Sequence, residues 1–417
     1  MTDVRRAIEA VFRIEGPRLI AGLARLTRDV GRAEELAQDA MVTALERWPE
    51  TGIPDNPGAW LAQTAKHRAI DGMRRAKLAD HKHAELGHMT GAPRAPDLAA
   101  RLDDDLGDDL LRLVFTCCHP TLSMEARVAL TLRLLGGLTV EEIARAFLVP
   151  APTIGQRIVR AKKQLADEEV PFEVPARGDL PERLAGVLEV IYLVFNEGYA
   201  ATAGDDLMRP ALCADALRLV RVLAGLVPDE PEVHGLAALL EIQASRSAAR
   251  VDVAGDPVLL LDQNRARWDR VLIRRGLAAL ARAGELVGAG HARGPYHVQA
   301  AIAACHARAA AAEDTDWATI AALYGDLAEL TPSPIVELNR AVAIAMAYGP
   351  EVGLQLVDAI AGEPALARYH LLPSVRGDLL RRLGRLAEAR AELARAAELA
   401  TNARERELLL RRAAAIS

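Results

Sequence analysis

Residues 138–165 read LTVEEIARAFLVPAPTIGQRIVRAKKQL and contain two short helical patterns separated by a turn. Thr139 with Glu142 matches a capping box, which predicts the start of a helix that ends near Phe147. Residues 148–152 form the turn before the second pattern begins. This order of elements is that of a helix-turn-helix motif.

The second helix of the motif has one apolar face and one basic face. Thr153 with Gln156 predicts its start, and its pattern continues through Leu165. We expect a buried stripe of Ile154, Ile158, Ala161 and Leu165 and an open side of Gln156, Arg157, Arg160 and Lys163. A structural helical hairpin has the same pattern. No acidic residue lies between Pro152 and Gln164, which favours a helix that enters the phosphate-lined major groove of DNA.

Two longer helical patterns lie near the start of the chain. Residues 33–48, AEELAQDAMVTALERW, repeat apolar residues at helical spacing, and Pro49 is predicted to end this helix. The polar residues off the apolar stripe are Glu34, Glu35, Gln38 and Asp39. A loop rich in glycine and proline, residues 50–58, leads into a second helix at 59–81, which begins AWLAQTAKHRAIDGMRR.

Basic residues gather on two of these helices. All five lysines of the chain fall within residues 66–82 and 152–164, and each stretch has a net charge of +4. Solvated helix faces are the ordinary explanation for such runs. Two separated basic helices nevertheless suit a polyanion. The segment 168–417 has the opposite balance, with 27 basic and 34 acidic residues.

The composition predicts a folded chain of several domains. It has 417 residues, of which 51% are hydrophobic and 26% charged, with a net charge of −6. Apolar residues recur at helical spacing almost throughout, so the fold class is predicted to be all-α. We expect a cytoplasmic protein without a membrane span, because no apolar run reaches about 18 residues and the first residues do not form a signal peptide. Four cysteines are too few for a disulfide framework.

The patterns predict five segments along the chain. They are a first helical domain at 1–86, an acidic flexible linker at 87–108, the helix-turn-helix domain at 109–167, a helical extension at 168–296 and a repeat domain at 297–417. Small and apolar positions near the end match tetratricopeptide helix pairs, with copies expected at 297–332, 333–366 and 367–401. An irregular helical array is the alternative. A hairpin is expected at 250–261, turning at residues 255–256.

Catalytic and metal motifs are missing from the sequence. It has no phosphate-binding glycine loop, nucleophile elbow, paired-histidine zinc helix or CxxC. Cys117, Cys118 and His119 suggest a metal site, but adjacent cysteines on a helix diverge by about 100°, so buried thiols are favoured. The polar residues of 195–199 are expected to be packing groups. We therefore predict no enzyme activity, no cofactor and no metal.

Three segments, 33–48, 59–75 and 138–165, resemble in order and spacing a bacterial extracytoplasmic-function (ECF) sigma factor of the sigma-70 family of RNA polymerase. This resemblance covers about 1–167. The remainder resembles the subfamily with a long tetratricopeptide-like C-terminal extension, in the segments FNEGY at 195–199, DTDW at 314–317 and SPIVELNRAVA at 333–343. It implies two small helical sigma domains, the second a helix-turn-helix, followed by a helical extension that regulates their activity.

The resemblance also implies three groups of site residues. Docking on core RNA polymerase would use Glu34, Glu35, Gln38 and Asp39. The minus-10 promoter element would be melted and held by Trp60, Lys66, His67, Arg68, Arg74 and Arg75, although His67 stands where the family usually has asparagine. The minus-35 element would be read by Thr153, Gln156, Arg157, Arg160, Lys162 and Lys163. The implied partners are core RNA polymerase, promoter DNA and a protein or ligand partner of the extension.

Two other functions remain open on the sequence. The first is an operator-binding helix-turn-helix regulator whose repeat domain senses a ligand or partner. It accounts equally well for 139–165 and 297–401, but it does not explain the docking motif and basic helix within 33–75. An enzyme with a helical accessory domain would need a catalytic constellation that the sequence lacks. The acidic extension itself could mask the basic domains or serve as a platform that they need.

Overall fold

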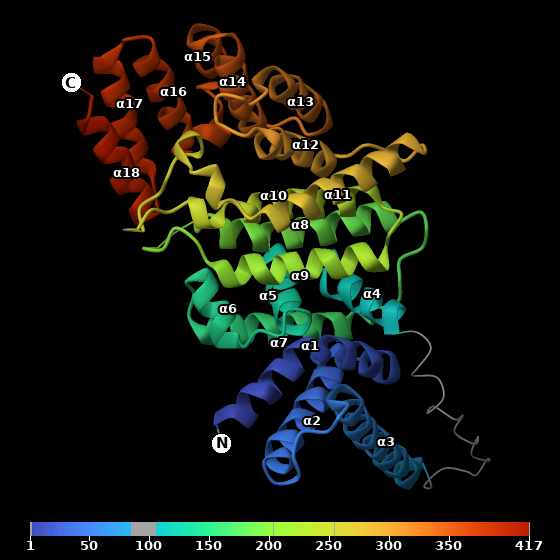
Figure 1. Cartoon of the computed structure of the whole chain (residues 1–417). Helices are drawn as coiled ribbons and strands as arrows, with labels where there is room; N and C mark the ends of the chain where they lie inside the picture. Colours follow the sequence, from blue (N-terminus) through green and yellow to red (C-terminus); the bar gives the residue numbers. More distant parts are fainter. Residues whose placement is uncertain (1, 85–105, 203, 254, 417) are drawn as a thin grey trace. The chain divides into compact units, whose positions relative to one another are not determined.

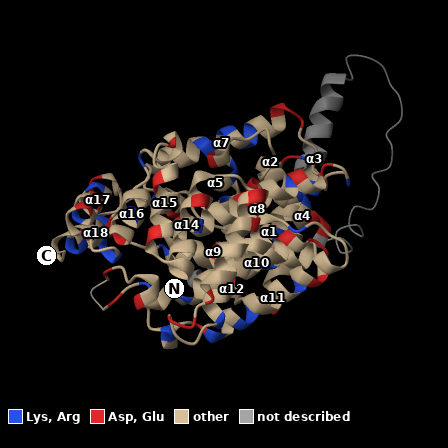
Figure 2. Ribbon diagram, turned by 90° about the horizontal axis from the view of Figure 1, so that it is seen from above, with Lys and Arg blue, Asp and Glu red and all other residues tan. Residues whose placement is uncertain are grey.

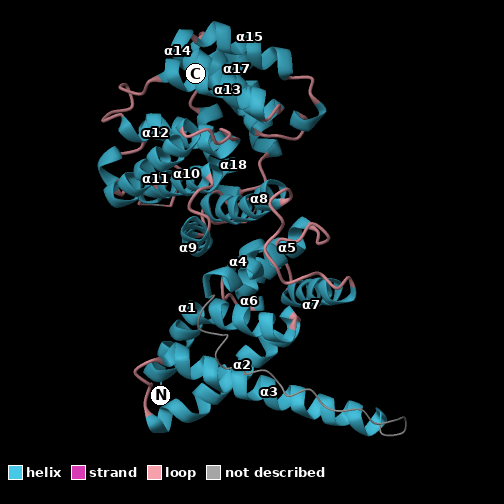
Figure 3. Cartoon of the chain, turned by 90° about the vertical axis from the view of Figure 1, so that its right-hand side faces the viewer, coloured by secondary structure: helices cyan, strands magenta, loops and turns pink. Residues whose placement is uncertain are grey.

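The computed structural model describes residues 2–84, 106–202, 204–253 and 255–416 and is helical throughout (Figures 1 and 3). These residues form 18 α-helices and no β-strand, which confirms the all-α prediction. Inter-residue contacts divide the chain into two compact units, residues 1–191 and 192–417. No helix within the described ranges is both long enough and apolar enough to span a membrane.

The first unit holds two small groups of helices. α1 packs against α2, α3 and α4, and α7 packs against α5 and α6. Their bounds are α1 (Thr2–Thr27), α2 (Val30–Thr51), α3 (Pro57–Ala84), α4 (Leu106–Cys117), α5 (Met124–Leu134), α6 (Val140–Phe147) and α7 (Ala151–Asp167). The division between the two units falls inside α8 (Leu180–Tyr199), so this one helix contributes residues to both.

In the second unit most consecutive helices pack on one another. Its helices are α9 (Pro210–Leu226), α10 (Pro231–Ser245), α11 (Arg270–Gly288), α12 (Pro295–Arg308), α13 (Trp317–Leu330), α14 (Pro334–Tyr348), α15 (Pro350–Ile360), α16 (Leu371–Arg382), α17 (Leu386–Leu399) and α18 (Ala403–Ala414). Each of the three predicted repeats holds one helix pair, α12 with α13, α14 with α15 and α16 with α17. The expected hairpin is represented by an antiparallel bridge between Val251 and Pro257, with Gly255 at a φ of 83°.

Small residues set the spacing within these pairs. A Cβ on Gly353 of α15 would lie 2.3 Å from the Cβ of Ala345 on α14, and a Cβ on Gly377 of α16 would lie 3.0 Å from Cγ of Leu393 on α17. The helices therefore approach too closely at Gly353 for any side chain. Such contacts are typical of the small positions that tetratricopeptide repeats place between their helices.

Two predicted helix ends are wrong. Pro49 was expected to end its helix, but α2 continues to Thr51 and ends at Gly52, whose φ is 81°. A second error concerns Thr153, which was expected to cap α7; the helix begins earlier, after Pro150, and has no side-chain cap. Proline is tolerated in the first turn because its missing N–H has no helical partner there.

The predicted linker at 87–108 can be compared with the structure only at its end. α4 begins at Leu106, so the last three residues belong to a helix. The rest of the linker lies outside the described residues. The boundaries of the five predicted segments remain predictions.

Burial of His306 predicts that the second unit loses stability in acid. The ring is 9% exposed and packs edge-to-face on Trp317, at 5.1 Å between ring centroids. Burial, with Arg246 and Arg265 nearby, lowers the pKa of His306 from 6.5 to about 4. The unfolded chain therefore takes up this proton at a higher pH than the folded chain, and stability falls as the pH drops from 6.5 towards 4.

The expected cost at pH 5, relative to pH 7, is about 2 kcal/mol from this residue alone. Urea unfolding of the full chain at both pH values, followed by circular dichroism, measures it. His306→Phe keeps the ring contact and should remove this part of the pH dependence. An unchanged pH dependence in His306→Phe would show that the residue is not the cause.

Candidate nucleic-acid interface

The helix-turn-helix is built as its sequence predicts. Thr139 Oγ1 accepts a hydrogen bond from the Glu142 backbone N–H at 3.1 Å, and the Glu142 carboxylate accepts one from the Thr139 N–H at 2.8 Å. This capping box fixes the start of α6. Leu148 ends α6 in the left-handed region, at a φ of 52°, and α7 starts three residues later.

The buried and open faces of α7 separate cleanly. Ile154, Ile158, Ala161 and Leu165 are each at most 5% exposed, as predicted. Thr153, Gln156, Arg160 and Lys163 are exposed, and Arg157 is partly buried. Within the described part of the chain, neither Arg160 nor Lys163 makes an ion pair. Figure 2 shows basic residues following one another along α7. The open face therefore offers cations and an amide to a polyanion.

Glu34 lies elsewhere than predicted. It was expected on the open docking face of α2, but it is 4% exposed. Its Oε1 accepts a hydrogen bond from Arg133 Nε at 2.7 Å and from Gln38 Nε2 at 2.6 Å, and its Oε2 pairs with Lys162. Two cations, from α5 and α7, compensate the charge of the buried carboxylate.

This cluster, Glu34 with Gln38, Arg133 and Lys162, joins residues that were assigned to different surfaces. Lys162 was predicted to contact the minus-35 element, and Glu34 and Gln38 were predicted to contact polymerase. Arg133 was not predicted at all. It lies 99 residues from Glu34 in the sequence, and only the fold of the first unit brings the two side chains together. A local sequence pattern cannot predict a pairing between residues so far apart.

The other acidic docking residues are accessible. The Glu35 side chain is 66% exposed and pairs with Arg32 at 2.9 Å, one turn away on the same helix. The Asp39 side chain is 57% exposed and pairs with Arg68 of α3 at 3.2 Å. Arg68 also donates a hydrogen bond to Thr43 Oγ1 at 2.8 Å. A predicted minus-10 residue is thus held against the predicted docking helix.

The remaining minus-10 residues follow one another along α3. Trp60 is partly buried and packs edge-to-face on Trp48, with ring centroids 5.3 Å apart. Lys66 is partly buried and His67 is exposed. Arg74 and Arg75 belong to α3, but their side chains lie outside the described part of the structure.

The two adjacent cysteines are buried. Cys117 and Cys118 are 0% and 3% exposed. Burial raises the pKa of Cys117 well above its usual value and that of Cys118 to about 11, which disfavours the thiolate that binds metals. No group of three or more potential ligands gathers among the described residues. The prediction that Cys117 and Cys118 are buried is confirmed.

Known protein families match three parts of the chain. Sigma-70 region 2 matches residues 11–78, and Sigma-70, region 4 matches residues 112–165. The first match covers α2 and most of α3, and the second covers the helix-turn-helix. Residues 183–284 match a family of unknown function (DUF6596).

Curated relatives divide in the same way. A protein of Rhizobium meliloti (strain 1021) named "Uncharacterized protein R00370" is 46% identical over 391 residues, 93% of this chain and 91% of the relative. The ECF RNA polymerase sigma factor SigK of Mycobacterium ulcerans (strain Agy99) is 29% identical over 34% of this chain and 75% of its own length. The ECF RNA polymerase sigma factor SigC of Mycobacterium tuberculosis (strain CDC 1551 / Oshkosh) is 27% identical over 40% of this chain and 86% of its own length. No solved structure matches the chain significantly.

The matched regions coincide with the segments that have the geometry of a DNA-reading protein. Region 4 ends where α7 presents its basic open face, and region 2 contains the acidic and basic helices α2 and α3. The chain therefore belongs to the extracytoplasmic-function sigma factors of RNA polymerase.

Proposed function

We propose that the chain selects promoters by reading the minus-35 element with the open face of α7 and the melted minus-10 element with α3. The observation that carries this proposal is the separation of faces on α7, where four apolar residues anchor the helix and the polar and basic residues stay accessible. A recognition helix needs this arrangement, because it must pack on its own domain while its other side enters the groove.

The open face of α7 contains suitable partners for both bases and phosphates. Arg157 and Arg160 can each donate two hydrogen bonds to a guanine edge, and Gln156 suits adenine. Lys163 is a flexible point charge that suits phosphate, which fixes position without reading sequence. Lys162 differs from these residues, because the structure pairs it with Glu34. We assign it a smaller part in DNA binding than its neighbours.

On α3, aromatic and basic residues suit a single strand. Trp60 and His67 offer ring faces on which an unstacked base can stack, and Lys66 and Arg68 follow Trp60 on the same helix. The cations would attract the backbone of the melted strand. Footprinting of the holoenzyme on promoter DNA tests both assignments, because they require protected bases near minus-35 and unpaired, reactive bases near minus-10.

Docking on core polymerase should depend on Glu35 and Asp39. The variant Glu35→Lys/Asp39→Lys reverses two exposed charges and leaves the apolar stripe of α2 intact. If these carboxylates face cations of the polymerase, like charges then meet, and we expect core binding to fall by about tenfold or more. Co-purification with core enzyme at physiological salt measures the loss.

The matched control for this variant is Glu46→Lys/Glu50→Lys, which makes the same charge change at exposed positions near the other end of α2. It should bind core enzyme normally. Equal yields of core enzyme with the two double variants would show that Glu35 and Asp39 do not belong to the docking surface.

We further propose that the extension supports the sigma domains instead of masking them. α8 supplies the reason, because its first half packs on region 4. Arg183 donates a hydrogen bond to the Phe115 carbonyl at 3.0 Å and lies over the Phe115 ring. The same helix continues into the second unit, where Phe195 is 1% exposed. A chain that ends near residue 170 loses this helix altogether.

A truncation after Val170 is therefore expected to transcribe weakly, and one after Tyr199, which keeps α8, to recover part of the activity. In vitro transcription with core polymerase compares both with the full chain. Higher activity of the 1–170 chain than of the full chain, shrinking at high salt, would instead support masking by the acidic extension. Equal activity of all three chains would contradict both ideas.

A further inference from the structure

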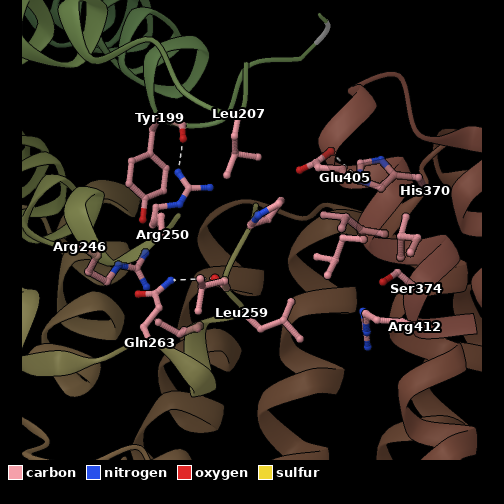
Figure 4. Close-up of a pocket in the computed structure, with 16 residues that line it drawn as sticks. Tyr199, Leu207, Arg246, Arg250, Leu259, Gln263, His370, Ser374, Glu405 and Arg412 are labelled. Atoms are coloured by element: carbon pink, nitrogen blue, oxygen red, sulfur yellow. Dashed lines mark hydrogen bonds and ion pairs between the residues drawn. The ribbon is translucent and has the colours of Figure 1, made fainter. Parts of the chain in front are cut away.

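The second unit contains a pocket of about 320 Å³. It is lined by residues from the end of α8, the loops at 246–263, α16 and α18 (Figure 4). Figure 4 shows Tyr199, Arg246, Arg250 and Gln263 on one side, and His370, Glu405, Ser374 and Arg412 on the other. Its volume lies at the lower end of the range for small-molecule sites.

Two arginines in this pocket lack an acidic partner. Arg250 stacks on Tyr199, with its guanidinium carbon 3.7 Å from the ring centroid, and donates to the Tyr199 carbonyl. Arg246 lies 5.8 Å from both the Tyr199 and the Trp268 ring centroids and donates to Gln243. No carboxylate of the described residues lies within ion-pairing distance of either guanidinium. Both residues are partly buried. Charged groups withdrawn from water are normally paired, so this pair of cations is unusual.

The other charges of the pocket do not supply the missing anion. Glu405 is the acidic residue of the lining, and it lies 3.4 Å from His370, on the side opposite the two arginines. Arg412 is already paired with Asp378. Burial lowers the pKa of Arg250, whereas Glu405 acts on it only as a weaker, opposing influence. The pocket therefore has an excess of positive charge at its Arg246 and Arg250 end.

Polar atoms near this end are also left without partners. Gln263 is 8% exposed; its Nε2 donates to the Val258 carbonyl at 3.2 Å, but its Oε1 has no hydrogen-bond partner among the described residues. Nε of Arg246 is likewise buried and unpaired there. Unpaired buried groups cost free energy, and a bound molecule that pairs with them would remove this cost.

The rest of the lining is apolar. Several leucines belong to the lining, among them Leu259, Leu260 and Leu409. A second cavity, of about 630 Å³, shares Leu259, Leu260 and Arg412 with the first, so apolar space continues beyond it. A bare inorganic ion would leave this surface uncovered. An anion with an apolar body would pair with the arginines and cover the leucines together.

We propose that this pocket binds a small organic acid, whose carboxylate or phosphate group pairs with Arg246 and Arg250 and whose apolar body lies along Leu259 and Leu260. The site belongs to the extension and stands independently of how the sigma domains read DNA. It gives the extension a ligand of defined chemistry.

Binding to the full-length chain tests the proposal without any transcription assay. The probes are linear carboxylates from butanoate to decanoate, the matching alkyl phosphates and the matching neutral amides, titrated by calorimetry. We expect saturable 1:1 binding of at least one acid, and at least tenfold weaker binding of its amide. The tighter of the two acid series identifies the head group.

Substitution connects the binding to the two arginines. Arg246→Gln/Arg250→Gln should weaken binding of the best acid at least tenfold. Arg274→Gln/Arg275→Gln removes the same charge from exposed positions on α11 and should bind like the unmodified chain. Circular dichroism establishes that both variants are folded. Arg250→Lys, which keeps the charge, should retain part of the affinity and serves if the double variant fails to fold.

Three results would overturn the proposal. They are no saturable binding by any acid of either series, equal binding of an acid and its amide, and unchanged binding in a folded Arg246→Gln/Arg250→Gln chain. The second would leave only an apolar cavity. The third would place the anion elsewhere on the molecule.

Discussion

Replacing Arg157 and Arg160 together with alanine is expected to weaken binding of the minus-35 element by about 2–6 kcal/mol. Each arginine that holds a guanine through two hydrogen bonds contributes about 1–3 kcal/mol of discrimination. Arg160 is exposed and Arg157 only partly buried, whereas the stripe that anchors α7 consists of other residues. The helix should therefore stay folded while it loses its main contacts to base edges.

Binding of holoenzyme to promoter fragments with an intact and a scrambled minus-35 element measures this effect. The loss in the double variant should be confined to the intact element. Lys163→Ala should weaken both fragments alike, because a phosphate contact carries no sequence information. Arg274→Ala/Arg275→Ala, which removes two exposed arginines from the extension, is the matched control. Unchanged transcription from the cognate promoter by the Arg157 and Arg160 variant would refute the assignment of α7.

Replacing Glu34 with alanine is expected to destabilise the contact between α2 and the helix-turn-helix domain by about 3 kcal/mol. Removing one member of a buried ion pair leaves its partners uncompensated, at a cost of about 3–5 kcal/mol. We place Glu34 at the lower end, because the side chains of Arg133 and Lys162 are 23% and 21% exposed and keep some contact with water.

Hydrogen exchange of the full chain, resolved to α2, α5 and α7, measures the loss at these helices. Glu35→Ala is the matched control, since it makes the same change at the neighbouring position, where a side chain 66% exposed forms a surface pair. Surface pairs contribute at most about 1 kcal/mol. Equal exchange in the two variants would mean that the Glu34 cluster does not hold these helices together.

Local patterns predicted the helix-turn-helix well. The capping box of Thr139 and Glu142 depends only on residues three positions apart, and the buried stripe of α7 follows from the helical period. Both are properties of one segment. The sequence also indicated three helix pairs between residues 297 and 401, because small and apolar residues recur there, and the structure has α12 to α17 in this part of the chain. Their division into tetratricopeptide-like repeats stays a prediction.

Features that depend on distant partners could not be predicted. Glu34 has the polarity of an open surface residue, and only α5 and α7 make its burial possible. The end of α2 was predicted wrongly for a local reason. The helix accommodates Pro49 in its last turn and ends at Gly52. The contacts of the pocket arginines also depend on distant residues. Tyr199 was expected to be a packing residue, yet it lies under Arg250, which is 51 residues away.

Membership of the sigma factor family makes this chain a transcription initiation factor and not an enzyme. That agrees with a sequence in which no catalytic constellation could be found. The family also accounts for the segment 33–75, which an operator-binding regulator would not need.

Transcription in vitro with core RNA polymerase, with and without the full chain, on the genomic DNA of its host tests this account most directly. Sequencing of the transcript ends should reveal start sites that depend on the added chain and share minus-35 and minus-10 elements at a fixed spacing. A chain that binds DNA but adds no start sites to those of core enzyme alone would contradict the account and favour an operator-binding regulator.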